Sequence, residues 1–393
     1  MPVVTLPRAL LSILSLAVLA SAAFLLWSWY RGYDLRDVDG VVWHVHGPVW
    51  RLFAGLAMLA WSFFGRSLVL LLIPAGRREP RDERGVGRTV AGPDGSVLYV
   101  EETGPKNAPT LVLTHGWGLD STAWRYIKRA LDSRFRLVTW DLPGLGRSKM
   151  PADGKLTIDR FAACLGEVVR SAGAPRVVLV GHSIGGMTTQ TVWRACDDEV
   201  RGRVAGMVLV DTTHENPLRT MWLSPLWVAL RWPLIEPLSW LTIALSPLVW
   251  LMNWQSYLSG GSQLAMRLTG FGKYATRQQV DLSARLASKG SPGVQAKGNL
   301  AMFRWAITDR LPDIHVPVLI LAGDKDIVTL PHANETIARN LPNGRLVSME
   351  GAGHMGFMER ADAYNDAIAK FAADVLAEGP HLANGRAEAP ALP

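Results

Sequence analysis

A serine lies on a short glycine-containing turn directly after an apolar segment. Residues 177–180 are all apolar, and Gly181-His182-Ser183-Ile184-Gly185 follows them. A G-x-S-x-G turn between a strand and a helix exposes the serine hydroxyl, and it requires glycine where a side chain would collide. The N-terminus of the following helix supplies positive potential to a developing oxyanion. We therefore predict that Ser183 is a nucleophile that attacks an acyl carbonyl and forms an acyl-enzyme.

An acid and a histidine follow this serine, in that order. The mainly apolar residues 317–322 lead into Gly323-Asp324-Lys325-Asp326, and Gly351-Ala352-Gly353-His354 lies near the end of the chain. In such an arrangement the histidine takes the serine proton, while the acid fixes the imidazole tautomer and stabilises its charged form. The order Ser, Asp, His together with the preceding strand makes the G-x-S-x-G signal specific.

These segments resemble the α/β-hydrolase superfamily, and the resemblance covers roughly residues 90–376. It implies that Ser183 is the nucleophile and that His354, in a G-x-G-H loop, is the base. The family pattern G-x-x-D selects Asp326 rather than Asp324 as the acid. Asp211, which ends the apolar segment 206–210, is the alternative acid, because some relatives use that strand instead.

Two further loops carry the resemblance. His115-Gly116-Trp117-Gly118 looks like the loop that supplies half of an oxyanion hole, which implies that the backbone N–H groups of Trp117 and Ile184 bind the oxyanion. Loss of one such donor costs about 2.7–4 kcal/mol of transition-state stabilisation. Residues 141–148 resemble the D-x-x-G-x-G-x-S loop of the family. We interpret the side chains of His115 and Asp141 as structural hydrogen-bonding groups.

Other reactions share parts of this pattern. Haloalkane dehalogenases and epoxide hydrolases of the superfamily carry aspartate at the nucleophile position, so Ser183 argues against both. A C–C bond hydrolase, a perhydrolase and a non-catalytic membrane protein with a hydrolase fold stay open as alternatives. Cys164 and Cys196 lack metal-ligand or redox spacing, so we expect two reduced thiols, no metal and no organic cofactor.

Strand-like and helix-like segments alternate after residue 92, which predicts an α/β fold with a mostly parallel sheet and helices on both faces. Several of the expected strands are continuous apolar runs, as in strands buried on both faces. The expected strands are Val97–Glu101, Thr110–Thr114, Arg136–Trp140, Val177–Val180, Gly206–Val210, Val316–Ala322 and Leu346–Met349.

Residues 1–76 are predicted to be a membrane anchor. Ala9–Tyr30 has no charged residue in 22 positions, enough for a helix to cross a hydrocarbon core of about 30 Å, and aromatic residues end it as in an interfacial belt. A cleaved signal peptide is the alternative. Leu52–Ile73 is the second predicted span; its Arg66 could snorkel or face a neighbouring helix. A helix in the plane of the interface is the alternative for this segment.

Residues 77–92 are predicted to be a linker, and the densest basic cluster of the chain lies there. The net charge is +7, and five arginines, at 77, 78, 81, 84 and 88, follow the second apolar segment. This position is typical of a juxtamembrane segment and not of a nucleic-acid binder. The positive-inside bias therefore favours a catalytic domain on the cytoplasmic side of the cell membrane.

Residues 217–311 are predicted to be a helical lid inserted into a hydrolase core formed by 93–216 and 312–376. Six of the sixteen tryptophans lie between Trp222 and Trp254. They indicate either an acyl-binding or membrane-contacting lid or a lid packed on its own domain. Prolines interrupt this stretch, so we do not expect a third span. The tail 377–393 is predicted to be disordered.

The combined hypothesis is a membrane-anchored serine hydrolase that cleaves a carboxylic ester through an acyl-enzyme. The anchor and the apolar lid favour an apolar or lipid-like small-molecule ester.

Overall fold

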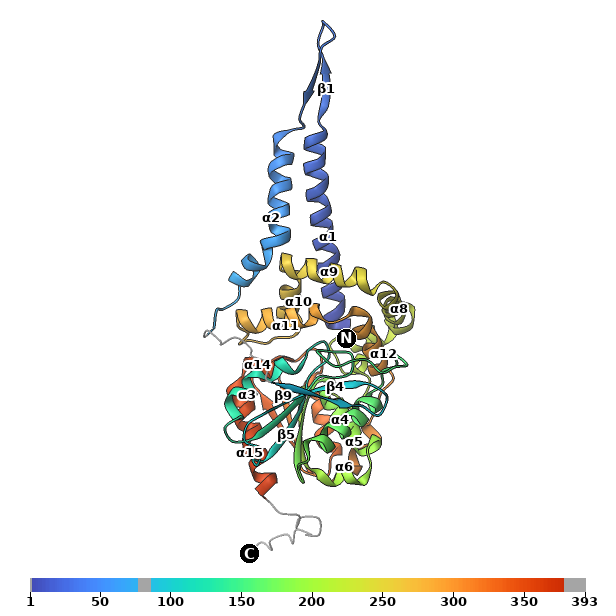
Figure 1. Cartoon of the computed structure of the whole chain (residues 1–393), viewed down its shortest axis with the longest axis vertical. Coiled ribbons are helices and arrows are strands. Elements are labelled where there is room, and N and C mark those ends of the chain that lie inside the picture. The colour runs from blue at the N-terminus through green and yellow to red at the C-terminus, as the bar shows by residue number, and fades with distance from the viewer. Residues whose placement is uncertain (1, 77–85, 378–393) are drawn as a thin grey trace, which may run out of the picture.

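The structure, a computed structural model, describes residues 2–76 and 86–377. Two long helices, α1 (Pro2–Arg31) and α2 (Val49–Leu71), rise side by side from a globular part as a stalk (Figure 1). The connection between them contains an antiparallel hairpin of β1 (Tyr33–Arg36) and β2 (Val42–Val45). Except for Ala377, the tail predicted to be disordered lies outside the described residues.

The globular part is built on an eight-stranded sheet, and the predicted fold class is confirmed. Its order is β10-β9-β8-β7-β5-β6-β4-β3, in which only the pairs β3–β4 and β4–β6 are antiparallel. The strands are β3 (Gly87–Ala91), β4 (Val97–Thr103), β5 (Thr110–Thr114), β6 (Arg136–Trp140), β7 (Val177–His182), β8 (Val204–Val210), β9 (Val318–Gly323) and β10 (Gly344–Met349).

The predicted linker 77–92 was wrong for residues 87–91, which form the edge strand β3. Residues 77–85 lie outside the described part of the chain. Arg88 of β3 donates to Glu102 at 2.9 Å and to the Ser171 carbonyl at 2.9 Å. An edge strand can carry charged side chains toward water, so its Arg- and Gly-rich sequence resembled that of a linker.

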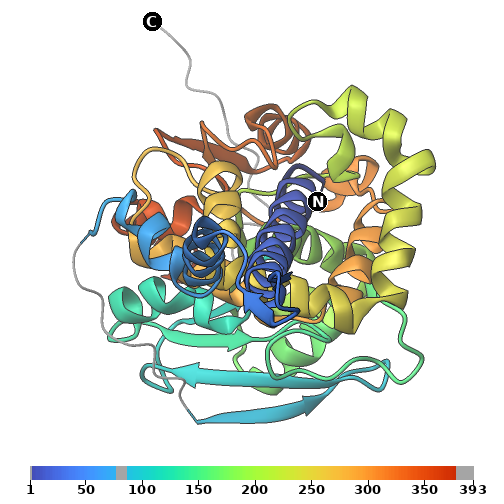
Figure 2. The ribbon, with the colours of Figure 1, turned by 90° about the horizontal axis from the view of Figure 1, so that it is seen from above.

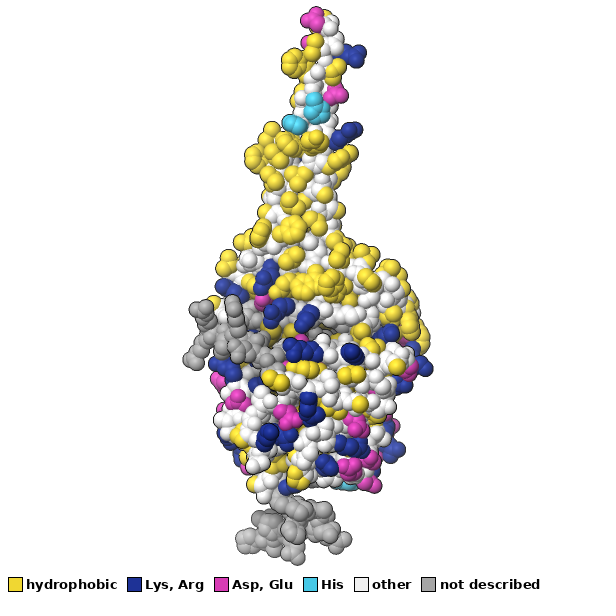
Figure 3. Space-filling view, viewed as in Figure 1, with side chains coloured by type: hydrophobic (Ala, Val, Ile, Leu, Met, Phe, Trp, Pro, Cys, Tyr) yellow, Lys and Arg dark blue, Asp and Glu magenta, His cyan; other side chains and the backbone are white. Residues whose placement is uncertain are grey.

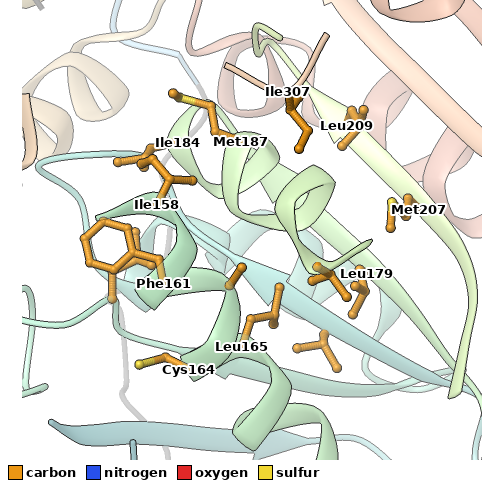
Figure 4. Close-up of a cluster of buried hydrophobic side chains, with 14 of the residues drawn as sticks. Ile158, Phe161, Cys164, Leu165, Leu179, Ile184, Met187, Met207, Leu209 and Ile307 are labelled. Atoms are coloured by element: carbon orange, nitrogen blue, oxygen red, sulfur yellow. The ribbon is translucent and has the colours of Figure 1, made fainter. Parts of the chain in front are cut away.

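Helices cover both faces of the sheet. One face carries α4 (Ile158–Ala172), α5 (Ile184–Ala195), α6 (Asp198–Arg203) and α13 (Pro331–Asn340); the other carries α3 (Arg125–Leu131) and α15 (Ala361–Ala377), with the short α14 (Gly356–Glu359) before it. The central strands alternate between the two cores: Leu179 faces the first, while Val178 and Val180 face the second. In the first core, Ile184 and Met187 of α5 lie near Ile158 and Phe161 of α4 (Figure 4).

Between β8 and β9 the chain forms a set of helices, α7–α12, that we call the lid. They lie between the stalk and the sheet (Figures 1 and 2). The lid comprises α7 (Ser224–Leu230), a π-helical turn (Arg231–Ile235), α8 (Glu236–Ala244), α9 (Ser246–Ser259), α10 (Gly261–Thr269), α11 (Arg277–Lys289) and α12 (Pro292–Met302). Short 3₁₀ turns occupy Ser121–Trp124, Pro217–Arg219 and Thr308–Asp313.

Both stalk helices contact the lid directly. Ser15 of α1 and Ser259 of α9 share a hydrogen bond of 2.7 Å between their hydroxyl groups. Arg66 of α2 forms two hydrogen bonds to the Asp281 carboxylate of α11, at 2.7 and 2.5 Å. Of the two roles that the sequence left open for Arg66, facing a neighbouring helix is therefore the one observed.

Candidate active site

Ser183 lies on a tight turn between β7 and α5. Its backbone has φ 54° and ψ −119°, a positive φ that is costly for a residue other than glycine. The flanking glycines leave no room for a side chain: a Cβ on Gly181 would lie 2.3 Å from the Gly185 oxygen, and one on Gly185 would lie 2.2 Å from the Thr114 oxygen. The sharp turn at Ser183 therefore depends on both glycines of the motif.

The structure brings Ser183, His354 and Asp326 together in one line of hydrogen bonds. His354 Nε2 lies 3.0 Å from Ser183 Oγ, and His354 Nδ1 lies 2.8 Å from Asp326 Oδ2. Ser183 directly follows β7, while His354 and Asp326 lie in the loops after β10 and β9, and the three residues are 4 %, 9 % and 2 % exposed in that order. This geometry suits a nucleophile, a general base and an orienting acid.

Several donors fix the Asp326 carboxylate. Oδ1 accepts the N–H groups of Val328 at 2.7 Å and Thr329 at 2.9 Å, and Oδ2 also accepts the Thr329 hydroxyl at 2.6 Å. Because these contacts use both oxygens, the carboxylate has one orientation toward His354.

Asp211, the alternative acid, has a different environment. Its carboxylate accepts the Gly323 N–H at 2.7 Å and the Tyr364 hydroxyl at 3.2 Å. Burial, and next the nearby Asp326 carboxylate, raise the pKa of Asp211 well above its usual value. The structure pairs His354 with Asp326 and not with Asp211.

The loop after β5 holds the predicted oxyanion donor Trp117. The indole N–H of Trp117 donates to the Gln295 carbonyl of α12 at 2.9 Å, which fixes the ring beneath the lid. Among the residues that the structure describes, the backbone N–H of Trp117 has no acceptor. The N–H of Ile184 opens α5, where helix geometry leaves it without an intrahelical acceptor. Both are available as oxyanion donors.

The side chains interpreted as structural do form hydrogen bonds within the loops. His115 Nδ1 donates to the Gly116 carbonyl at 2.8 Å, and Nε2 accepts the Leu142 N–H at 3.0 Å. The Asp141 carboxylate accepts the N–H groups of Ser121 at 2.7 Å and Arg147 at 2.8 Å.

His182, next to the nucleophile, was given no role in the sequence analysis. Its Nε2 donates to the His354 carbonyl at 2.9 Å, and its ring lies 4.5 Å from that of Phe357 between centroids. Burial lowers the pKa of His182 well below its usual value, so the ring is a neutral donor. It holds the backbone of the base, and only its place inside the G-x-S-x-G motif could have indicated this.

Glu359 was missed as well, and it joins the lid to the His354 loop. Its carboxylate accepts the Gly353 N–H at 2.8 Å and the Gly272 N–H at 2.7 Å, although burial raises its pKa. The Met355 N–H also donates to the Gly270 carbonyl at 2.8 Å. The segment after α10 therefore supports the loop that carries the base, a contact that no local sequence pattern signals.

Within the described ranges, no three His, Cys, Asp or Glu side chains are grouped so that they could hold a metal ion. Cys164 and Cys196 are free thiols.

Comparison with known proteins extends these observations. The model of the alpha/beta hydrolase family matches residues 111–367. The chain is 28% identical over 285 residues to the pimeloyl-[acyl-carrier protein] methyl ester esterase of Vibrio atlanticus, which covers 70% of this chain and 98% of that protein. It is 29% identical over 283 residues to polyketide synthase ThaQ of Burkholderia thailandensis, covering 68% of this chain but only 12% of the synthase. A solved structure of a malate-bound thermophilic esterase from Thermogutta terrifontis matches with a TM-score of 0.60 and 23% identity, over 74% of this chain and 99% of that one.

Proposed function

The chain belongs to the alpha/beta hydrolase family, and we propose that it is a membrane-anchored serine esterase that cleaves an apolar, lipid-like carboxylic ester. The observation that carries the chemistry is the line of hydrogen bonds from Ser183 Oγ through His354 to Asp326, with distances of 3.0 and 2.8 Å. Similarity to a protein named as a methyl ester esterase supports an ester as the substrate.

The mechanism follows from this geometry. His354 Nε2 takes the proton of Ser183 as Oγ attacks the ester carbonyl, and Asp326 stabilises the imidazolium that results. The oxyanion accepts hydrogen bonds from the N–H groups of Trp117 and Ile184. His354 then passes the proton to the departing alcohol, which leaves an acyl group on Ser183. Water, deprotonated by the same histidine, releases the acid and restores the serine.

The stalk supports membrane anchoring. Val4–Arg31 and Val49–Leu71 are long and apolar enough to span a bilayer, and only 17% and 22% of their most apolar windows are buried. Hydrophobic side chains cover the stalk and the part of the globular domain next to it, whereas charged side chains gather at the tip and farther from the stalk (Figure 3). A surface of this kind suits a lipid environment.

The length of the stalk supports a position of the lid at the level of one leaflet. Trp27, Tyr30, Trp43 and Trp50 are each more than half exposed near the hairpin and suit one interface. A hydrocarbon core of about 30 Å corresponds to about 20 helical residues, which brings the other boundary to about Pro7–Leu10 in α1 and Leu70 in α2. At these levels both stalk helices contact α11: Arg8 of α1 donates to the Ala287 carbonyl of α11, and Arg277 of α11 donates to the Leu70 carbonyl of α2. The α9 helix lies closer to the stalk tip than α11 (Figure 1), within this depth.

The exposed side chains of α7–α9 support contact with lipid. This part of the lid is a bent helix pair, Ser224–Ala244 and Ser246–Ser259 at 98°, that is apolar enough for a broken span or a re-entrant segment. Its large apolar side chains that are at least 40 % exposed are Leu226, Val228, Trp232, Leu234, Leu238, Trp240, Leu241, Leu248, Trp250 and Leu251. A soluble domain rarely exposes so continuous an apolar surface.

The N-terminus and the catalytic domain lie at the same end of the stalk (Figure 1). The α2 helix ends at the same end of the stalk, and the sequence that follows it is rich in arginine, so the positive-inside bias supports the cytoplasmic side for both.

A chain-length series of p-nitrophenyl esters, from acetate to palmitate, tests the chemistry on full-length protein in detergent and on Ser183→Ala. We expect wild type to hydrolyse esters and the variant to lose activity. Turnover by Ser183→Ala, or none by wild type, would contradict the proposal. Extraction of native membranes at high pH tests the anchor, which predicts that the protein stays in the pellet.

A further inference from the structure

A mostly apolar cavity of about 240 Å³ lies between the beginning of α1 and the lid. Its apolar lining includes Leu6 and Ile13 of α1, Leu238 of α8, Met252 of α9 and Phe303 after α12. None of the triad side chains lines it, and α12 separates it from the oxyanion loop, since Gln295 lines the cavity while its carbonyl accepts the Trp117 indole N–H. A ligand in this cavity is therefore not placed to react with Ser183, and the cavity is a site of its own.

The α1 wall of the cavity carries two polar atoms without partners. The Ser12 side chain is 2 % exposed, and among the described residues its hydroxyl has no hydrogen-bond partner. Arg8 donates through Nη2 to the Ala287 carbonyl at 2.8 Å and to the Ser288 hydroxyl at 3.3 Å, but its buried Nε has no acceptor in the described part of the chain. Both residues line the cavity. Buried polar groups are nearly always paired, so these two atoms indicate an acceptor that a ligand supplies.

The charge of Arg8 favours an anionic acceptor. Its two partners are a carbonyl and a hydroxyl, and no acidic side chain within residues 2–76 and 86–377 pairs with it. A positive charge beside apolar surface is costly unless an opposite charge pairs with it. Arg8 and Ser12 are four residues apart on one helix, so their side chains lie on the same face. The two oxygens of one carboxylate can therefore accept hydrogen bonds from both.

The size and lining of the cavity indicate the rest of the ligand. A methylene group is similar in size to a water molecule, whose share of the liquid is about 30 Å³, so the cavity suits a single apolar chain of about eight carbons and not the two chains of a phospholipid. Ile13 and Leu238 line the cavity although they are 56 % and 44 % exposed, so it opens at the surface between α1 and α8. Under the proposed anchoring, this opening faces lipid.

We propose that this cavity binds a medium-chain fatty acid, with the carboxylate on Arg8 and Ser12 and the chain between α1 and the lid. The inference goes beyond the proposed esterase function, because the site lies apart from the triad and binding requires no turnover. The bound acid supplies the counter-charge of Arg8 and contacts both α1 and the lid. It assigns the first turns of α1 a part in ligand binding besides anchoring.

Equilibrium dialysis of radiolabelled octanoate and octanol against full-length Ser183→Ala in nonionic detergent tests the site, with protein-free micelles as the blank. Octanol has the same chain without the charge, so we expect octanoate to bind about tenfold more tightly. Arg8→Met, added to Ser183→Ala, is expected to weaken octanoate binding about tenfold and to leave octanol within about threefold. Arg31→Met is the matched control, because Arg31 is an exposed arginine at the other end of α1, and it should change neither affinity.

Ser12→Ala decides the question if Arg8→Met does not fold, and we expect it to weaken octanoate binding about fivefold. Absent octanoate binding, equal affinity for octanoate and octanol, or octanoate affinity that no folded variant changes would overturn the inference. The last of these results would place the acid at another site, such as the active site. Because Ser183→Ala performs no turnover, these outcomes do not depend on the esterase proposal, which the p-nitrophenyl ester series tests separately.

Discussion

Replacing Asp326 with asparagine tests which carboxylate orients His354. Two backbone N–H groups, of Val328 and Thr329, donate to Oδ1 at 2.7 and 2.9 Å, while Oδ2 faces His354 Nδ1 at 2.8 Å. In Asp326→Asn the amide oxygen must keep the Oδ1 position, because an NH₂ group there would face two donors. The NH₂ group is then directed at His354 Nδ1.

This orientation selects the wrong imidazole tautomer. An NH₂ group stabilises a lone pair on Nδ1, so the proton moves to Nε2, and Nε2 can no longer accept the Ser183 proton across their 3.0 Å hydrogen bond. The same exchange of aspartate for asparagine in a serine protease lowers kcat about 10⁴-fold, which corresponds to about 5 kcal/mol. We expect a loss of that size in Asp326→Asn, with little change in thermal unfolding because the volume is preserved.

The assay is kcat for a short p-nitrophenyl ester, with Asp211→Asn as the matched control. The Asp211 carboxylate contacts Gly323 and Tyr364 and not His354. Since its raised pKa favours the neutral acid, an amide is a close substitute, and we expect a loss below about tenfold. The reasoning is refuted if Asp326→Asn keeps more than about a tenth of wild-type kcat, or if Asp211→Asn loses as much as Asp326→Asn.

Three further predictions follow from local geometry. Gly181→Ala should lower kcat by about 100-fold or more, because its Cβ would displace the start of α5. Gly202→Ala is the control and should keep wild-type kcat, because no atom lies within 4 Å of its added Cβ. Equal activity of the two variants would contradict the turn argument. Arg66→Met should destabilise the detergent-solubilised protein by about 1–2 kcal/mol, since Arg66 and Asp281 are only 37 % and 20 % exposed; a double-mutant cycle showing no coupling between them would disprove this. Burial raises the pKa of Cys164 to about 12, so its protonated thiol should resist maleimide at pH 8 until the protein unfolds, and rapid labelling of the native protein, read by mass spectrometry, would exclude this burial.

The residues that could be predicted from the sequence lie on turns with strong local requirements. An added Cβ on Gly181 would collide with the Gly185 oxygen, and one on Gly185 would collide with the Thr114 oxygen of β5. The spacing of the two glycines therefore predicts the local structure. The same holds for the central strands, whose continuous apolar runs reflect burial on both faces. The α/β fold and the positions of Ser183 and His354 on loops at strand ends were therefore accessible without coordinates.

The remaining features depend on contacts between distant segments. Glu359 is one of many acidic residues in the sequence, and only the approach of Gly272 and Gly353 gives it a function. The edge strand β3 has no apolar run, because its pairing with β4 leaves one edge in water. The sequence does not show what pairs with the charge of Arg66 inside the predicted span, because its partner Asp281 lies 215 residues farther along the chain.

These long-range contacts join the stalk, the lid and the base into one connected unit. Arg277 of α11 donates to the carbonyls of Leu70 at 2.7 Å and Ile73 at 3.3 Å, which ties the lid to the end of α2. After α10 the chain contacts the His354 loop through Glu359 and through the Gly270 carbonyl. A lid held at both places cannot swing away from the sheet without breaking its contacts to the stalk.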